Sequence, residues 1–215
     1  DKTLEILKEY PVKIVATNVK GVGSARNVLA SAATGRIIAW IDSDVVIPIN
    51  WLELREKIHR EHSEIDSLSN FMQLMDIEEA KEKSKIPVSL EKVVLTPIDV
   101  YKCEVSQSSL TIERNIVQKA GGYDPFFEWG EEWDLQIRLS RIGAKLYCIN
   151  TCLAYHMKSK EFLERSERFL LHDLTPRDLI FAGNFVCFFS KYGFWYIKHC
   201  PRHFLSFLLR LWLLY

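Results

Sequence analysis

The first 62 residues alternate between helical patterns and short apolar runs. Three segments have apolar residues at helical spacing, and two have the alternating or continuous apolar pattern of strands. The expected helices cover 3–10, 22–33 and 51–62, with Gly35 as C-cap of the second, and the expected strands cover 12–16 and 37–41. This alternation predicts an α/β fold with a mostly parallel sheet joined by right-handed crossovers.

The chain from 63 to 160 continues this alternation of helices and strands, interrupted by one charged run. Strands are expected over 68–75, 106–112 and 145–149, helices over 115–120 and 131–142, and a solvated charged run over 78–85. Gly143 is the expected C-cap of the last helix. His156 is expected on a loop after the last strand.

Residues 161–215 differ in composition, because seven of the twelve phenylalanines lie beyond residue 180. The end of this segment, 204–215, is apolar on nearly every side, but it is shorter than the roughly 20 apolar residues of a membrane span. It is therefore interpreted as a buried helix, as a helix lying in the membrane interface, or as the first half of a span. We expect two units, a domain over 1–160 and a helical, aromatic-rich extension over 161–215 that attaches to the cytoplasmic side of a membrane.

The overall charge and the cysteines narrow the class of protein. The 28 basic residues balance the 28 acidic ones, so there is no electrostatic case for binding nucleic acid. Five cysteines without CxxC spacing argue against a disulfide framework and against a zinc finger. The first residues lack the basic and apolar regions of a signal peptide. A cytoplasmic location is expected.

Two groups of carboxylates indicate the chemistry. Asp42 and Asp44 directly follow the buried strand, and the carboxyl end of a strand is where an open α/β sheet binds its ligands. Glu131, Glu132 and Asp134 open a later helix, where the helix dipole favours negative charge. Alone, the second group would be read as an ordinary charged first turn. Together, the two groups indicate a metal-dependent transferase with a separate carboxylate base.

Several motifs occur in an order that is typical of one enzyme family. They are Gly21–Asn27, Thr34–Gly35, Asp42–Asp44, Gly121–Pro125, Trp129–Leu139 and His156. With these motifs the chain resembles the family-two inverting glycosyltransferases of GT-A fold. The resemblance implies transfer of a sugar from a nucleotide-sugar to an acceptor hydroxyl with inversion, on a glycan or a lipid-linked acceptor.

The resemblance also implies how a cation and the donor are held. Asp44 would be the main ligand of Mn²⁺ or Mg²⁺, and Asp42 would contact the ribose or the metal. His156 matches a third ligand in some relatives, although a lone histidine after a strand is more often a polar loop residue. On the nucleotide-sugar side the resemblance places Arg26, Asn27, Ser43 and Arg114. The alternatives are that Asn27 caps its helix, that Arg26 is solvated, and that Arg114 caps a helix.

For the acceptor side, the resemblance makes Glu132 the base that takes the proton from the hydroxyl. Relatives more often have Asp at this position, and glutamate adds a methylene. Glu131 would bind the acceptor or hold Glu132, and Trp129 would contact the acceptor. Asp134 is expected to pair with Arg138 at i, i+4 in a structural role.

Relatives begin with a strand, a helix and a second strand that grip the nucleobase. Asp1–Thr3 corresponds to the end of that unit, so the resemblance implies that a piece of roughly 30 residues or more is absent before it. A non-catalytic relic that binds a nucleotide-sugar or a partner is the main alternative. A metal-dependent phosphatase using Asp42 and Asp44 is weaker, because Val45 stands where such enzymes have Thr. A metal site of His59, His62 and Glu61 is weakest, because their helix has a solvated, charged pattern.

Overall fold

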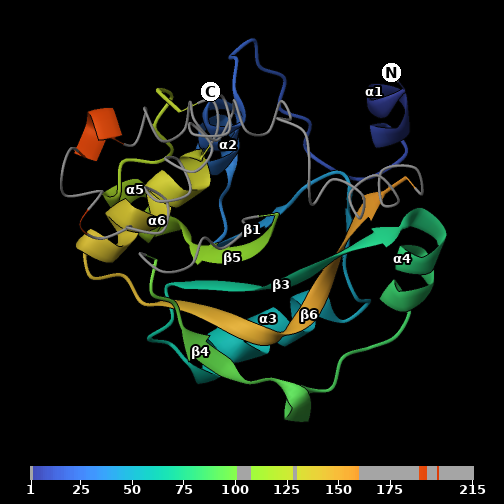
Figure 1. Cartoon of the computed structure of the whole chain (residues 1–215). Coiled ribbons are helices and arrows are strands. Elements are labelled where there is room, and N and C mark those ends of the chain that lie inside the picture. Colours follow the sequence, from blue (N-terminus) through green and yellow to red (C-terminus); the bar gives the residue numbers. More distant parts are fainter. Residues whose placement is uncertain (1, 101–107, 128–129, 160–188, 193–197, 199–215) are drawn as a thin grey trace, which may run out of the picture.

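The computed structural model describes residues 2–100, 108–127, 130–159, 189–192 and 198. One sheet lies at its centre, with helices on both sides (Figure 1). The strands are β1 (Ile37–Ile41), β2 (Val45–Val46), β3 (Ser67–Asp76), β4 (Leu95–Pro97), β5 (Ser109–Glu113) and β6 (Leu146–Lys158). The helices are α1 (Thr3–Leu7), α2 (Val22–Ala32), α3 (Trp51–Glu61), α4 (Ile77–Ser84), α5 (Arg114–Lys119) and α6 (Glu131–Arg141), with a 3-10 turn at Leu90–Lys92. The predicted α/β class is confirmed.

The strands pair in the order β1-β5-β3-β6-β2, with β4 added on β6. Among the described strands only β3 and β6 run parallel, and the other pairs are antiparallel. The expected predominance of parallel pairs therefore does not hold. The reason is that apolar runs mark which segments are buried strands but carry no information on strand direction. β5 lies between β1 and β3 and runs against both.

Several element boundaries differ from the predicted ones. The segment 12–16 forms no strand, and no described strand pairs with it. The charged run after β3 is a helix, α4, whose N-cap Asp76 accepts a hydrogen bond from the Glu78 amide. Helix α2 ends at Ala32, because Ala33 is already extended, so Gly35 is not its cap. His156 lies within β6 and not on a loop, because β6 continues far beyond the predicted 145–149.

Gly143 ends α6, as predicted. This glycine has a φ of +80°, a left-handed conformation that side chains with a Cβ rarely adopt. Its amide donates to the carbonyl of Ser140, and the Ala144 amide donates to that of Leu139. These two bonds form a Schellman motif that ends the helix.

The two faces of the sheet bury separate cores. On one face, Ile38 and Trp40 of β1 and Leu110 and Ile112 of β5 pack with the apolar side of α6. On the other face, α3 packs against β3 and β6. Figure 1 shows α2, α5 and α6 together on one side of the sheet and α3 on the other. Helices α2 and α6 on the first side carry residues of the candidate site.

A buried polar network joins α3 to the sheet. Arg55 is 1% exposed, stacks over the Trp51 ring at 4.6 Å, and donates to the Leu68 carbonyl and the Asn70 side chain. His59 is 2% exposed, and its Nε2 lies 2.9 Å from Thr111 Oγ1. The expectation that the histidines of this helix form a solvated face therefore fails at His59, since only His62 is exposed.

The extension over 161–215 lies mostly outside the described residues. Its described part includes residues 189–192, which are helical, and Phe189 and Tyr192 pack against the α6 core. The predicted apolar segment 204–215 is not among them. Within the part of the chain that the structure describes, no helix has the length and apolarity that a bilayer crossing requires.

The burial of His59 predicts how stability depends on pH. Burial, reinforced by the nearby Arg55 charge, lowers the pKa of His59 from 6.5 to about 4. The unfolded chain therefore takes up this proton first as the pH falls, and folding stability is lost between pH 6.5 and about 4. This loss is at most about 3 kcal/mol.

We expect the free energy of unfolding of His59→Gln to fall less with decreasing pH than that of the wild type, in urea unfolding measured from pH 7 to pH 4.5. His62→Gln, which changes an exposed residue beside the same helix, is the control and should keep the wild-type pH dependence. An unchanged pH dependence in His59→Gln would mean that other groups cause the loss of stability in acid.

Candidate active site

Asp42 and Asp44 lie in a tight turn where β1 ends. The Asp42 amide donates to the Ser108 carbonyl at 3.2 Å, which continues the pairing of β1 with β5 for one more residue. The Val45 amide then donates back to the Asp42 carbonyl at 3.1 Å and closes the turn into β2. The two carboxylates are therefore presented together at the carboxyl end of β1, as the sequence predicts.

Arg26 of α2 gathers carboxylates from two other elements. Its Nη2 lies 3.2 Å from Asp42 Oδ1, and its Nη1 lies 3.0 Å from Glu131 Oε1 and 2.9 Å from Glu132 Oε1. The Arg26 residue is 6% exposed. The structure thus brings together the end of β1 and the start of α6, which are some ninety residues apart in the sequence, around one buried guanidinium.

Glycines allow α2 and α6 to approach closely enough for this contact. A Cβ on Gly23 would lie 3.1 Å from the Tyr123 Cβ and 3.2 Å from the Glu131 Cγ. Gly130 precedes α6 with a φ of +80° and turns the chain into the helix. The first turn of α6 therefore packs directly on the first turn of α2, and Arg26 reaches its carboxylates from there.

The electrostatics of this cluster follow from burial and proximity. Burial acts to lower the pKa of Arg26, but the surrounding negative groups, Glu132 foremost, outweigh it and raise the pKa. Burial raises the pKa of Glu131, and its helix amide and Arg26 offset this only in part. Glu132 keeps more contact with solvent, since its side chain is 18% exposed against 9% for Glu131. Glu132 is therefore the carboxylate of this pair that an incoming hydroxyl can reach more readily.

A second cluster forms where β2 pairs with β6. Val45 lies opposite His156, and the Met157 amide donates to the Asp44 carbonyl at 2.8 Å. His156 Nε2 is 2.6 Å from Asp44 Oδ2, and Lys158 Nζ is 3.0 Å from the same oxygen. Partial burial acts to raise the pKa of Asp44, but the hydrogen bonds to Lys158 and His156 prevail and lower it.

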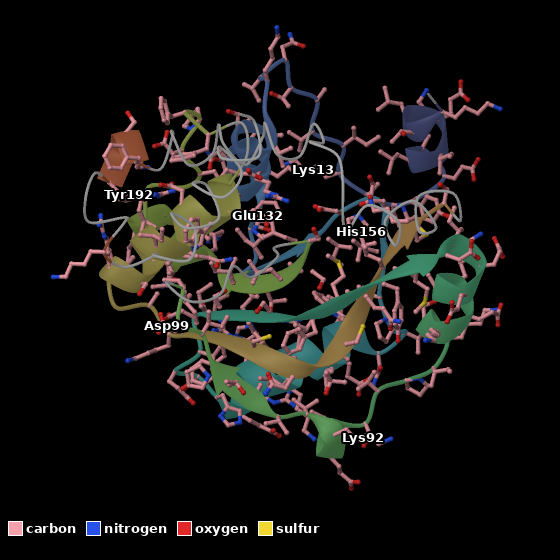
Figure 2. All side chains as sticks on the ribbon, in the orientation of Figure 1. Lys13, Lys92, Asp99, Glu132, His156 and Tyr192 are labelled. Carbon is pink, nitrogen blue, oxygen red and sulfur yellow. The ribbon has the colours of Figure 1, made fainter. Side chains whose placement is uncertain are left out.

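Figure 2 shows Glu132 on α6 and His156 on β6 on the same side of β3, while Lys92 lies at the opposite end of the molecule. The two clusters are linked by the short Asp42–Asp44 turn. Ser43, between them, is exposed. Trp129, predicted to contact the acceptor, lies outside the described residues.

Asn27 bonds the backbone of Tyr123. Its Nδ2 donates to the Tyr123 carbonyl, and its Oδ1 accepts from the Tyr123 amide, both at 2.7 Å. The side chain therefore holds the Gly122–Tyr123 corner, and Asn27 lies within α2 and does not cap it. It secures Tyr123, whose ring lies 5.6 Å from the Arg26 guanidinium.

Arg114 is not brought to the site. It follows Glu113, which pairs with Ile37 at the end of β1 opposite to Asp42. Its Nε donates to the Gly35 carbonyl at 2.9 Å. Contact of Arg114 with a nucleotide-sugar at the Asp42–Asp44 turn is therefore not supported by its position.

Asp134 pairs with Arg138, as predicted, with Oδ2 2.8 Å from Arg138 Nε. The carboxylate is fully buried and also accepts from Lys191 and Tyr192, so residues 189–192 are attached to α6. Asp134 therefore fixes α6, the helix that also carries Glu132, against residues 189–192.

The donors at the second cluster suit a divalent cation only in part. Among the residues that the structure describes, no three or more His, Cys, Asp or Glu side chains are grouped as a metal site. Asp44 and His156 form a pair, whereas Asp42 is directed to Arg26 and to Ser108 Oγ, which donates to Asp42 Oδ2 at 2.6 Å. Mg²⁺ commonly takes one or two carboxylates from the protein and completes its shell with water and substrate phosphates. The pair therefore fits the protein side of a site that a substrate would complete.

Three residues of the site were not predicted. Ser108 carries no signal of its own in the sequence, because strand pairing brings it to Asp42. Tyr123 lies in the Gly121–Pro125 motif, but only the Asn27 contact shows that it lies beside Arg26. Lys158 could have been found. Once His156 is placed in a strand, the residue two positions later lies on the same face.

Comparisons with known proteins agree with this geometry. Residues 1–83 match the model of the family described as glycosyl transferase family 2, which confirms the predicted resemblance over that stretch. No curated protein matches the chain.

Among solved structures, the crystal structure of S. aureus TarS 1-349 is similar, with a TM-score of 0.56 at 20% identity over 88% of this chain. The chain spans 59% of that structure's length. This likeness supports the GT-A type of α/β fold.

The Asn27 contact predicts a difference between two adjacent glycines. Gly121 and Gly122 have φ angles of +81° and +71°, so alanine at either costs about 1–2 kcal/mol in backbone strain. A Cβ on Gly122 would also lie 2.6 Å from Asn27 Oδ1, whereas one on Gly121 would meet nothing within 4 Å. Gly122→Ala should therefore lose about 3 kcal/mol or more, because Asn27 must also give up its hydrogen bonds.

Chemical denaturation of both variants measures this difference, with Gly121→Ala as the matched control for strain alone. Equal losses of stability in the two variants would show that Asn27 does not hold this corner.

Proposed function

We propose that the chain is a glycosyltransferase that moves a sugar from a nucleotide-sugar to an acceptor hydroxyl with inversion. The observation that carries the proposal is the Glu132 carboxylate held by Arg26 next to the Asp42–Asp44 turn. A transferase of this kind needs a base for the acceptor beside a site for the donor's diphosphate, and this arrangement supplies both. The match of residues 1–83 to a glycosyltransferase family supports it independently.

Glu132 would act as the base. As the acceptor oxygen bonds to the anomeric carbon, its proton passes to the Glu132 carboxylate, and the bond from that carbon to the diphosphate oxygen breaks. The nucleoside diphosphate leaves with the bonding electrons, and attack from the opposite face inverts the anomeric centre. Glu131, buried against α2, would serve to hold Arg26 and through it Glu132, which is one of its two predicted roles.

Asp44 and His156, with Asp42 beside them, would hold Mn²⁺ or Mg²⁺. Such a cation would stabilise the charge on the leaving diphosphate. Arg26 carries a second positive charge into the same region, and its contact with Asp42 keeps that carboxylate in place.

The acceptor class and the location belong to this proposal. A glycan or a lipid-linked sugar would be the acceptor, at the cytoplasmic face of a membrane. The support for a membrane surface is the aromatic-rich composition of 161–215.

The first experiment is a thermal-shift panel of UDP-, GDP- and dTDP-sugars with Mn²⁺, followed by a transfer assay with the donor that stabilises most. Binding that disappears in Asp44→Ala would support the donor site. Donor binding without transfer by the wild-type chain would instead favour the non-catalytic alternative.

Glu132→Gln is the critical variant for the chemistry. Loss of a general base typically costs about 10²- to 10⁴-fold in rate, so kcat should fall by this order while donor binding stays within about threefold. The amide keeps the size of the side chain and loses its ability to take a proton. Rapid-quench turnover and a donor titration measure the two quantities separately.

Glu131→Gln is the matched control, because it lies in the same helical turn and contacts the same guanidinium. It should lose less turnover than Glu132→Gln. If Glu132→Gln retained wild-type turnover with normal donor binding, Glu132 would not be the base.

A further inference from the structure

Lys158 occupies the space between the two proposed cation ligands. Its Nζ lies 3.0 Å from Asp44 Oδ2 and 2.6 Å from His156 Nε2. Asp44 Oδ2 and His156 Nε2 are themselves 2.6 Å apart. The ammonium of Lys158 is therefore in direct contact with both atoms that would bind a divalent cation.

The chemistry of the three groups limits the hydrogen bonds that they can form together. An ammonium can only donate, and a carboxylate can only accept. Nε2 of a neutral imidazole accepts when its proton is on Nδ1. Lys158 therefore donates to Asp44 Oδ2, whereas His156 Nε2 either donates to the same oxygen or accepts from Lys158, according to its tautomer. The ammonium lies against Oδ2 and Nε2, the two atoms that would bind a metal ion.

The fold places Lys158 there. His156 and Lys158 are two residues apart on β6, so their side chains lie on the same face. The pairing of β2 with β6 places Asp44, just before β2, in contact with both side chains. The Lys158 side chain is 23% exposed, compared with 67% for Lys85, the C-cap of α4. Lys158 is thus a half-buried partner of the site and differs from the solvated lysines of the surface.

We propose that the Lys158 ammonium takes the place of the divalent cation at Asp44 and His156, so that lysine and metal exclude each other. This inference rests on the proposed cation site and adds a built-in competitor to it. A metal ion must displace the ammonium before it contacts Asp44. The intrinsic affinity for a free divalent cation is consequently weaker than the ligands alone would provide.

The test is a titration of the protein with Mn²⁺ alone, in which electron paramagnetic resonance measures the free ion. Lys158→Met keeps most of the aliphatic stem and removes the charge. It should bind Mn²⁺ about tenfold more tightly or better than the wild type, because a full positive charge in contact with the ligands is gone. Lys158→Arg, which retains a cation, should stay within about twofold of the wild type.

Two further variants show where the effect arises. Lys92→Met removes an exposed lysine far from the site and should leave Mn²⁺ affinity unchanged. Adding Asp44→Asn to Lys158→Met should abolish the gain. Circular dichroism confirms folding, and Lys158→Gln replaces the methionine variant if that one does not fold.

Equal Mn²⁺ affinity in Lys158→Met and the wild type, with both weakened by Asp44→Asn, would overturn the inference and leave the cation site standing. No Mn²⁺ binding by any variant would remove the cation site and the inference together. The proposed glycosyl transfer would still be decided separately, by the donor panel and the Glu132→Gln assay.

Discussion

The buried guanidinium of Arg26 is the interaction on which the site depends. A charged group that is 6% exposed loses most of its hydration, and only close opposite charges compensate for this. Asp42, Glu131 and Glu132 supply them from the end of β1 and the first turn of α6. Removing Arg26 would leave like charges close together without a partner, so the positions of these three elements depend on one another.

Helix α2 organises the surroundings of that charge through neighbouring residues. Gly23 lets α6 approach, Arg26 binds the carboxylates, and Asn27 holds the backbone of Tyr123 beneath the guanidinium. The second cluster depends on a different element. The β2–β6 pairing brings His156 and Lys158 to Asp44, so the Lys158 ammonium lies where these groups meet.

Much of the site could be predicted because its residues occur in a recognisable order. Asp42 and Asp44 at the end of an apolar strand, and Glu131 and Glu132 at a helix start, are local patterns with direct physical meaning. The sequence does not reveal every contact of these residues. The partners of Asn27 and Arg114, which are the backbone of Tyr123 and the carbonyl of Gly35, lie far away along the chain.

By itself, the sequence determined the α/β class, the elements around the carboxylates and the residue types that do chemistry, because periodicity, glycine turns and helix starts are local properties. Only the tertiary structure decided that the sheet is mixed, that His156 lies in a strand and that Lys158 reaches Asp44. Strand direction and pairing depend on contacts between segments far apart in the chain. Those contacts determine which charge meets which, and no local pattern encodes them.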